Sequence, residues 1–395
     1  MSARRFALVA GGGTAGHLQP ALAVARALVA EHGPASVEMV GSRRGLERAV
    51  LVESELPVTL LPGRGISRRF SAPALVDNAL ALAGLVVAWF EALVVVANRR
   101  PRVVVAVGGY ACVPVALAAV VFRVPVVLVN VDAVPGAANR LVGRFAKAVA
   151  VAWPGTPLAR SAVTGAPVRP EVLAAVAPAS GREPGAGPDP AARVALDVPA
   201  GRLLVAAVGG SLGARRVNEA VLDLAAAWAD RGDLALYHVV GRRDADWVAQ
   251  KAPVAADGRE TPGTLWYRQV PYEEHMERVY SAADLVVSRA GGMTVAEIAL
   301  IGVPAVLVPL PGAPGDHQTA NARILVDAGA AVLVGDAACT GARLAAEIEA
   351  LVAEPGRLGA MAKAAATLGH PGATVAIAGL VDEHARPAPD QAAAA

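Results

Sequence analysis

The stretch Gly11-Gly12-Gly13-Thr14-Ala15-Gly16-His17 directly follows a short apolar run, residues 6–10, near the start of this 395-residue chain. A strand that breaks into a glycine-rich turn and then opens a helix is typical of a βαβ unit. Backbone N–H groups and the helix dipole favour an anion at such a turn. The stretch therefore predicts an α/β fold that begins with a phosphate-binding loop.

Short β-branched runs alternate with helix-length segments rich in Ala and Leu along the rest of the chain. This alternation is the βαβ pattern of a parallel sheet. Six strands in each half predict two Rossmann-like domains of similar size, which a chain of this length can hold. We expect the strands at residues 6–10, 37–40, 58–61, 103–107, 126–129 and 148–152, and at residues 203–208, 234–239, 265–269, 285–288, 305–309 and 331–334.

Proline and glycine mark residues 177–192, between the two halves, as a loop, and the hinge is expected near residues 163–165. The expected organisation is a first domain at 1–163, a second at 164–369, a helix at about 370–385 that can pack back on the first domain, and a disordered tail at 386–395.

Composition narrows the class of protein. Apolar residues make up 55% of the chain but aromatic residues only 4%, and the mean hydropathy is +0.46. Cys112 and Cys339 lie far apart, so neither a disulfide framework nor a zinc motif is indicated, which suits a reducing cytosol. The short apolar run leads into the glycine loop and not into an Ala-x-Ala site, so we expect no signal peptide.

Charge is distributed unevenly between the halves. Residues 1–165 hold 17 Lys and Arg against 8 Asp and Glu, a net charge of +9, whereas the remainder carries 19 against 26, a net charge of −7. A basic half favours an anionic partner, either nucleic acid or an anionic membrane surface. No aromatic residues interleave with the basic ones and no nucleic-acid motif occurs, so we expect no nucleic acid. Uneven surface charge without a partner is the alternative.

Residues 79–97 form a 19-residue apolar segment with one charge, Glu91. A spanning helix needs about 20 apolar residues, but an ionisable group inside lipid is costly, and the segment occupies the slot of a crossover helix. We expect a helix that is partly core and partly at a membrane surface. An ordinary buried helix with solvated flanking charges is the alternative. The flanking arginines are Arg64, Arg68, Arg69, Arg99, Arg100 and Arg102.

Two more glycine loops follow expected strands, at residues 108–111 and 209–214. The loop at residues 11–16 also matches the G-x-G-x-x-G dinucleotide fingerprint. Arg43 and Arg44 after the second strand could hold the 2′-phosphate of NADP. An NADP-dependent oxidoreductase is therefore an alternative. His17 argues against it, because a dehydrogenase has no obvious use for an imidazole beside the phosphate. A helix-start residue that merely caps is the other interpretation of His17.

The chain resembles the MurG family, the UDP-N-acetylglucosamine transferases that make lipid II for peptidoglycan. The resemblance runs in family order along nearly the whole chain. The motifs that carry it are GGGTAGH (11–17), VGGYACVP (107–114), AVPGAANR (133–140), TGAPVR (164–169), GGSLGAR (209–215), SRAGGMTVAE (288–297) and HQTANA (317–322).

The resemblance implies a GT-B fold with the active site in the interdomain cleft. It implies that the first domain docks on the cytoplasmic membrane face and takes the lipid-linked acceptor, whose diphosphate and transferred sugar lie near Thr14, Ala15 and Gly16. The second domain holds UDP, with no cofactor and no metal implied. The donor residues are Arg169 and Ser211 for the phosphates, Glu273 beside the uracil, Gly292, Met293, Thr294, Val295, Ala296 and Glu297 for uridine and phosphate, with Glu297 on the ribose diol, and Gln318 and Asn321 for the sugar.

Partners implied in this way are UDP-GlcNAc, the lipid-linked acceptor (lipid I), the anionic cytoplasmic membrane surface and, as further candidates, cell-wall synthesis proteins. The expected reaction is a single inverting displacement in which the acceptor C4 hydroxyl attacks C1 of the sugar. His17 is the first candidate for the base, because a neutral imidazole has a suitable pKa, and Asp132 is the second. Asp244-Ala245-Asp246 spells a metal-binding Asp-x-Asp, which we interpret as a solvated helix start.

The sequence departs from the family at a run that usually reads His-Glu-x-Asn. Here Val129-Asn130-Val131-Asp132 stands in its place, which puts the donor-sugar contacts and the base in question. Leu212 and Ala166 replace the usual Gln and Asn of two other motifs. A related GT-B enzyme with another sugar or acceptor, a UDP-sugar epimerase, and a membrane scaffold with a decayed site remain as alternatives.

Overall fold

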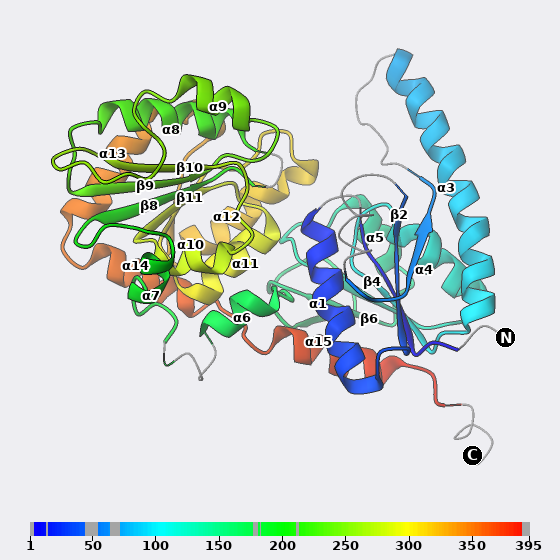
Figure 1. The fold of residues 1–395 in the computed structure, drawn as a ribbon. Coiled ribbons are helices and arrows are strands. Elements are labelled where there is room, and N and C mark those ends of the chain that lie inside the picture. Colours follow the sequence, from blue (N-terminus) through cyan, green and yellow to red (C-terminus); the bar gives the residue numbers. More distant parts are fainter. Residues whose placement is uncertain are drawn as a thin grey trace. The chain divides into compact units, whose positions relative to one another are not determined.

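The computed structural model describes residues 4–12, 15–43, 54–63, 72–176, 181, 183–210 and 213–388. The chain divides into two compact units (Figure 1). Unit 1 comprises residues 1–169 together with 372–395, and unit 2 comprises residues 170–371. Each unit is built on one parallel sheet with helices on its faces.

The sheet of unit 1 has the strand order β3-β2-β1-β4-β5-β6-β7. Its register pairs Ala7 of β1 with Val37 on one side and with Val103 on the other. The strands are β1 (Ala7–Ala10), β2 (Val37–Ser42), β3 (Val58–Leu61), β4 (Val103–Ala106), β5 (Val126–Asn130), β6 (Ala148–Val151) and β7 (Ser161–Val163). The described helices are α1 (Ala15–His32), α3 (Ala72–Arg99), α4 (Cys112–Val121), α5 (Ala137–Gly143) and α15 (Ala373–His384).

The two faces of this sheet are covered by different helices. Successive strand residues point to opposite faces. Ala7 and Val9 pack into a cluster with α1 and α15, whereas Leu8 and Ala10 pack into a second cluster with α3 and α4. Because both faces are covered, the four residues of β1 are all buried, as the continuous apolar runs of the sequence predict.

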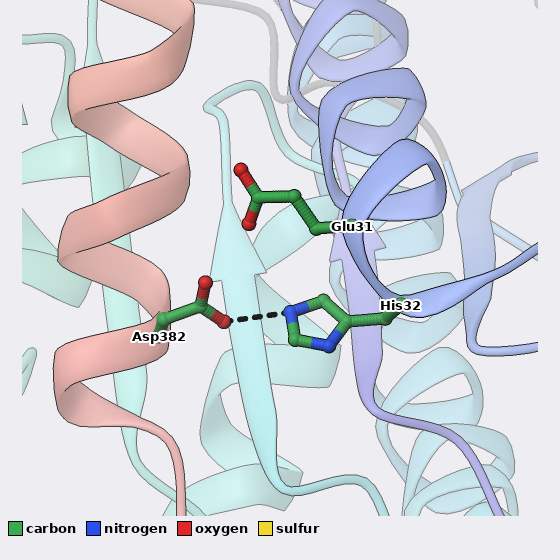
Figure 2. Close-up of side chains that lie close together, drawn as sticks. All are labelled: Glu31, His32 and Asp382. Atoms are coloured by element: carbon green, nitrogen blue, oxygen red, sulfur yellow. Dashed lines mark hydrogen bonds and ion pairs between the residues drawn. The ribbon is translucent and has the colours of Figure 1, made fainter.

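A polar cluster joins α1 to α15 at the rim of the first cluster (Figure 2). His32 Nε2 lies 2.7 Å from Asp382 Oδ1, and the His32 ring stacks on Phe6 with 3.6 Å between the ring centroids. Glu31 hydrogen-bonds the Asp382 carboxyl, and this contact raises the pKa of Glu31 above its usual value. The C-terminal helix is thus tied to the first helix of the chain by apolar and polar contacts.

Helix α3 has one face in the core of unit 1 and one face outside it. Ala88, Ala92 and Val96 are buried against the sheet and α4. The helix is long and apolar enough to cross a membrane by length and composition, but its packed face belongs to the core of unit 1. Its outward face is apolar along its length and carries Val76, Leu80, Leu82, Val86, Val87, Phe90 and Val94, each more than half exposed. The interpretation of this segment as an ordinary buried helix is therefore wrong.

The basic flanks of α3 are partly committed to contacts within unit 1. Arg99 pairs with the buried Glu38 at 2.6 Å, and Arg102 donates to the backbone oxygen of Arg386. Within the helix, Glu91 accepts from Arg43 at 2.8 Å. The expected flanking arginines at positions 64, 68 and 69, like Arg44, lie outside the described residues.

The sheet of unit 2 has the order β10-β9-β8-β11-β12-β13 and packs into a large apolar core. Its strands are β8 (Leu203–Val208), β9 (Leu234–Val239), β10 (Trp266–Val270), β11 (Leu285–Ser288), β12 (Ala305–Leu307) and β13 (Ala331–Leu333). The helices are α6 (Pro170–Val176), α7 (Pro190–Ala195), α8 (Arg215–Ala227), α9 (Ala245–Lys251), α10 (Met276–Ala282), α11 (Gly292–Ile301), η2 (Pro314–Asp316), α12 (His317–Asp327), η3 (Asp336–Ala338), α13 (Gly341–Ala353) and α14 (Arg357–Ala366).

All twelve predicted strands are present, with ends that differ from the prediction by two residues at most. The prediction missed β7, an edge strand of three exposed residues that has no apolar periodicity to reveal it. In the predicted loop at 177–192, α7 begins at Pro190, where the Asp189 side chain accepts from Ala191 N at 2.9 Å. In the predicted tail, Arg386 donates to Arg102 O and Phe122 O, and residues 389–395 lie outside the described chain.

Candidate active site

The first part of the site lies where strand order reverses in unit 1. β1 and β4 are neighbours, while the chain leaves β1 toward β2 and leaves β4 toward β5. In open α/β sheets, ligands bind outside the carboxyl ends of the strands at such a switch point. The loops after β1 and β4 meet there: a Cβ on Gly109 would lie 1.7 Å from Gly12 O, so only glycine permits this approach.

His17 stands in the first turn of α1, at the switch point. Ala15 and Gly16 begin this helix, so their backbone N–H groups belong to the set that has no intrahelical acceptor. The imidazole is partly exposed and packs against the second loop, because a Cβ on Gly108 would lie 2.8 Å from His17 Nδ1. Thr14 and Gly13 lie outside the described residues. The structure thus brings His17 and the loop at 108–109 together at the switch point of unit 1.

Asp132 follows β5, the neighbour of β4, and is half-buried. Its backbone oxygen accepts from Asn130 Nδ2 at 2.6 Å, and Asn130 Oδ1 accepts from Asn139 Nδ2 at 2.8 Å. Asn130 and Asn139 are both buried. The sequence shows Asn139 only as part of the motif at 133–140. No periodicity predicts its contact with Asn130, which forms because α5 packs beside the end of β5.

The second part of the site lies at the corresponding switch point of unit 2, between β8 and β11. The glycine loop after β8 begins with Gly209 and Gly210, while Ser211 and Leu212 lie outside the described residues. After β11, Gly292 begins α11, and Gly292, Val295 and Ala296 are buried while Met293 and Thr294 are partly exposed. The two segments that the family resemblance assigns to UDP therefore flank one switch point, where an anion is favoured.

Glu297 lies in the second turn of α11 and is 6% exposed. Its carboxylate therefore lies beyond the first turn, within which an acid favours the helix dipole. A carboxylate is rarely buried this deeply unless it is paired.

Two amides of α12 each hold a different loop, the one after β12 and the one after β11. Gln318 Oε1 accepts from Leu310 N at 2.9 Å, so its amide nitrogen faces away from that bond. Asn321 is fully buried and donates to Ala290 O at 3.1 Å, so it also supports the turn before α11. Gln318 is the more accessible of the two residues that the resemblance assigns to the sugar.

Glu273 lies in the loop after β10 and is partly buried. Its carboxylate accepts from the Tyr237 hydroxyl at 2.7 Å and from His275 N at 2.8 Å. Burial, reinforced by this carboxylate, raises the pKa of Tyr237 well above its usual value, so the phenol stays a donor. The sequence does not indicate a role for Tyr237, because the residue lies in a strand that is largely apolar.

A buried polar network supports the glycine loop after β8. Asn218 donates to Val240 O at 3.0 Å and to Asp244 Oδ2 at 3.2 Å, while His238 Nε2 lies 3.0 Å from Asn218 Oδ1. Burial lowers the pKa of His238 to about 3, so this imidazole is neutral. Asp244 is 1% exposed and also pairs with Arg215 at 3.1 Å. The interpretation of Asp244 as solvated is therefore wrong: it is buried directly before α9.

Arg169 ends the first segment of unit 1, residues 1–169, and is partly exposed. It stands directly before α6, the first helix of unit 2.

Comparison with known proteins identifies the family. Residues 7–151 match the glycosyltransferase family 28 N-terminal domain and residues 204–377 match the family 28 C-terminal domain. Two relatives are named UDP-N-acetylglucosamine--N-acetylmuramyl-(pentapeptide) pyrophosphoryl-undecaprenol N-acetylglucosamine transferase. That of Desulforudis audaxviator is 35% identical, covering 95% of this chain and 97% of the relative, and that of Alkalilimnicola ehrlichii is 39% identical, covering 96% and 99%. The crystal structure of Acinetobacter baumannii MurG superposes with a TM-score of 0.72 at 28% identity, covering 96% of this chain and 99% of that one. With two parallel-sheet domains of the GT-B type and near-full-length identity to these transferases, the chain belongs to the MurG family of glycosyltransferases.

Proposed function

We propose that this protein is an inverting glycosyltransferase that moves GlcNAc from UDP-GlcNAc to the C4 hydroxyl of undecaprenyl-diphospho-MurNAc-pentapeptide, lipid I, to form lipid II. The observation that carries the proposal is the sequence identity of 35–39% to transferases named for this reaction, which extends over nearly the full length of both chains. The glycine loops at the two switch points support it, because both substrates carry a diphosphate.

Unit 2 is the proposed donor side. Ser211, in the loop after β8, and Arg169 contact the diphosphate, and the start of α11, Gly292–Ala296, holds uridine and phosphate. Glu297 accepts from the two ribose hydroxyls, a role that suits an acceptor-only carboxylate. The further assignments are Glu273 beside the uracil, and Gln318 and Asn321 on the sugar hydroxyls.

Unit 1 is the proposed acceptor side. Thr14, Ala15 and Gly16 contact the acceptor diphosphate and the transferred sugar. His17 takes the proton of the C4 hydroxyl as that oxygen bonds to C1 of GlcNAc, while the bond from C1 to UDP breaks and the electron pair leaves with UDP. Arg169 and the helix starts stabilise the departing diphosphate. Asp132 is the second candidate base, because it lies at the same edge of the sheet.

A related enzyme with another sugar or acceptor is the second candidate function. The observation that favours it is the run at 129–132: Asn130 is occupied by its bonds to Asp132 O and Asn139, and Asp132 supplies a carboxylate where the family usually has an amide.

We also propose that unit 1 binds the cytoplasmic face of the cell membrane peripherally through α3. The outward row from Val76 to Val94 gives apolar contact on a unit whose net charge is positive. The lipid-linked acceptor, which resides in that membrane, would then meet the enzyme at the surface of unit 1.

The experiment that tests the function incubates the purified protein with UDP-GlcNAc and a short-chain lipid I analogue, with product followed by mass spectrometry. UDP-glucose and UDP-GalNAc run in parallel. We expect a disaccharide product selective for UDP-GlcNAc. Product formed only from another sugar nucleotide would instead favour the second candidate function.

The role of His17 is tested in the same assay with His17→Ala. The matched control is His384→Ala, which removes an imidazole of the same unit whose Nδ1 contacts only the backbone oxygen of Leu380 in α15 among the described contacts. We expect activity to fall about a hundredfold or more in His17→Ala and to persist in the control. Full activity of His17→Ala would move the base assignment to Asp132.

A further inference from the structure

Asn139 carries a buried acceptor whose partner the fold does not supply. The residue is 5% exposed, and its Nδ2 donates to Asn130 Oδ1 at 2.8 Å. Within the part of the chain that the structure describes, Asn139 Oδ1 has no hydrogen-bond partner. Because buried polar atoms are nearly always paired, such an exception needs an explanation, and a catalytic role is one of those known.

A backbone carbonyl sets the direction of both amides. Asp132 O can only accept, so the amide nitrogen of Asn130 must face it, as the 2.6 Å contact shows. Asn130 Oδ1 can only accept as well, so the amide nitrogen of Asn139 must face Asn130. The chain of donors therefore leaves Asn139 Oδ1, and not its nitrogen, directed away from Asn130.

The imidazole of His17 borders the same small volume. Gly108 has a φ of +102°, and a Cβ built on it would lie 2.8 Å from His17 Nδ1 and 3.2 Å from Asn139 Oδ1. Both atoms thus converge on one point beside the Gly108 backbone, where any other residue would place a side chain. The glycine keeps this volume open between the histidine and the amide.

We propose that Asn139 is a positioning residue whose Oδ1 accepts a hydrogen bond from Nδ1–H of His17 when the substrates are bound. This inference rests on the proposed role of His17 as the base. Hydrogen bonds of catalytic groups often tighten only in the complex. An acceptor at one ring nitrogen selects the tautomer that carries its proton there, so Nε2 keeps its lone pair and takes the proton of the C4 hydroxyl.

The amide also sets the basicity of the histidine. A carboxylate in its place would stabilise the imidazolium by charge and raise the pKa of the ring, whereas a neutral amide orients the ring without adding charge. The run at 129–132 likewise presents Asn130, and not the Glu usual in the family, to Asn139. On the side of Asn139, the proposed base His17 therefore faces neutral amides and no carboxylate of this pair.

Two variants of the full-length protein test the inference. Asn139→Leu has a similar size and no acceptor, and Asn139→Asp keeps an acceptor but adds charge. The tautomer of His17 is read from nitrogen chemical shifts of protein labelled with ¹⁵N-histidine, in complex with UDP and a lipid I analogue, with the signal assigned by its loss in His17→Gln. The pH profile of kcat/KM is measured for each active variant.

We expect the Nδ1–H tautomer in the parent protein and a shift toward the Nε2–H tautomer in Asn139→Leu, with kcat about a hundredfold lower and unchanged affinity for UDP. In Asn139→Asp the acidic limb of the pH profile should move upward by about one pH unit. An Nε2–H tautomer in the parent complex, or an unchanged tautomer and pH profile in both variants, would overturn the inference. If His17→Ala is fully active the base assignment fails, yet the tautomer measurement still decides whether Asn139 contacts His17.

Discussion

The Tyr237 hydroxyl donates a 2.7 Å hydrogen bond to Glu273 and thereby ties strand β9 to the loop after β10. The same carboxylate accepts from His275 N, so one buried phenol orders the turn that we propose lies beside the uracil.

Replacing Tyr237 by Phe should therefore weaken UDP binding and leave the chemical step unaffected. A lost hydrogen bond to a charged group corresponds to about 1.5–3 kcal/mol at most, so we expect the Kd for UDP to rise about tenfold, measured by isothermal titration calorimetry. Tyr110→Phe is the control, because it removes a 2.9 Å bond to Ser42 in unit 1. An equal loss of UDP affinity in both variants would contradict the assignment.

Glu297→Gln should weaken the donor complex more strongly. The amide retains the size of the side chain but accepts only one of the two hydrogen bonds proposed from the ribose. We expect at least tenfold weaker binding of UDP-GlcNAc, and a smaller loss for the 2′-deoxyribose analogue, which lacks one of the two hydroxyls. Glu219→Gln, at a partly exposed acid of α8, is the matched control. Equal losses with both nucleotides would sink the diol assignment.

Placing a charged residue on the outward face of α3 should weaken membrane binding without unfolding unit 1. Leu80 and Phe90 are 59% and 57% exposed, so Leu80→Glu and Phe90→Glu remove no core contact of similar size. Each apolar side chain kept out of lipid forgoes about 1.5–3 kcal/mol, so sedimentation with vesicles that contain anionic lipid should fall tenfold or more. Val194→Glu, at a 76% exposed position of unit 2, should bind vesicles like the parent protein.

His238 should make unit 2 sensitive to acid. Its pKa is lowered to about 3 in the folded chain by burial, whereas an unfolded histidine titrates near 6.5. The unfolded state thus binds the extra proton first, and stability is lost as pH falls from about 6.5 toward 3, by about 1.4 kcal/mol per pH unit from this residue. Denaturant unfolding of the parent and of His238→Gln should show a shallower dependence in the variant. Parallel pH dependences would show that His238 does not protonate on unfolding in this range.

Local sequence was enough to predict the sheets, because a strand buried on both faces must be apolar throughout. β1 and β11 reveal themselves in four residues each, and the glycine loops after them mark where anions are favoured. The exposed edge strand β7 obeys no such rule and was missed. Motif order along the chain predicted the family.

What only the tertiary structure decided are the contacts between residues far apart in sequence. The local sequence does not predict that Tyr237 hydrogen-bonds Glu273 or that the buried Asp244 accepts from Asn218. Nor does it predict that Asn139 Oδ1 lies beside Gly108, next to His17. Burial and hydrogen-bond direction depend on how the chain packs, because the same polar side chain can be either solvated or buried. The sequence therefore determines which groups are present and on which strand ends they stand, and packing decides which of them face one another.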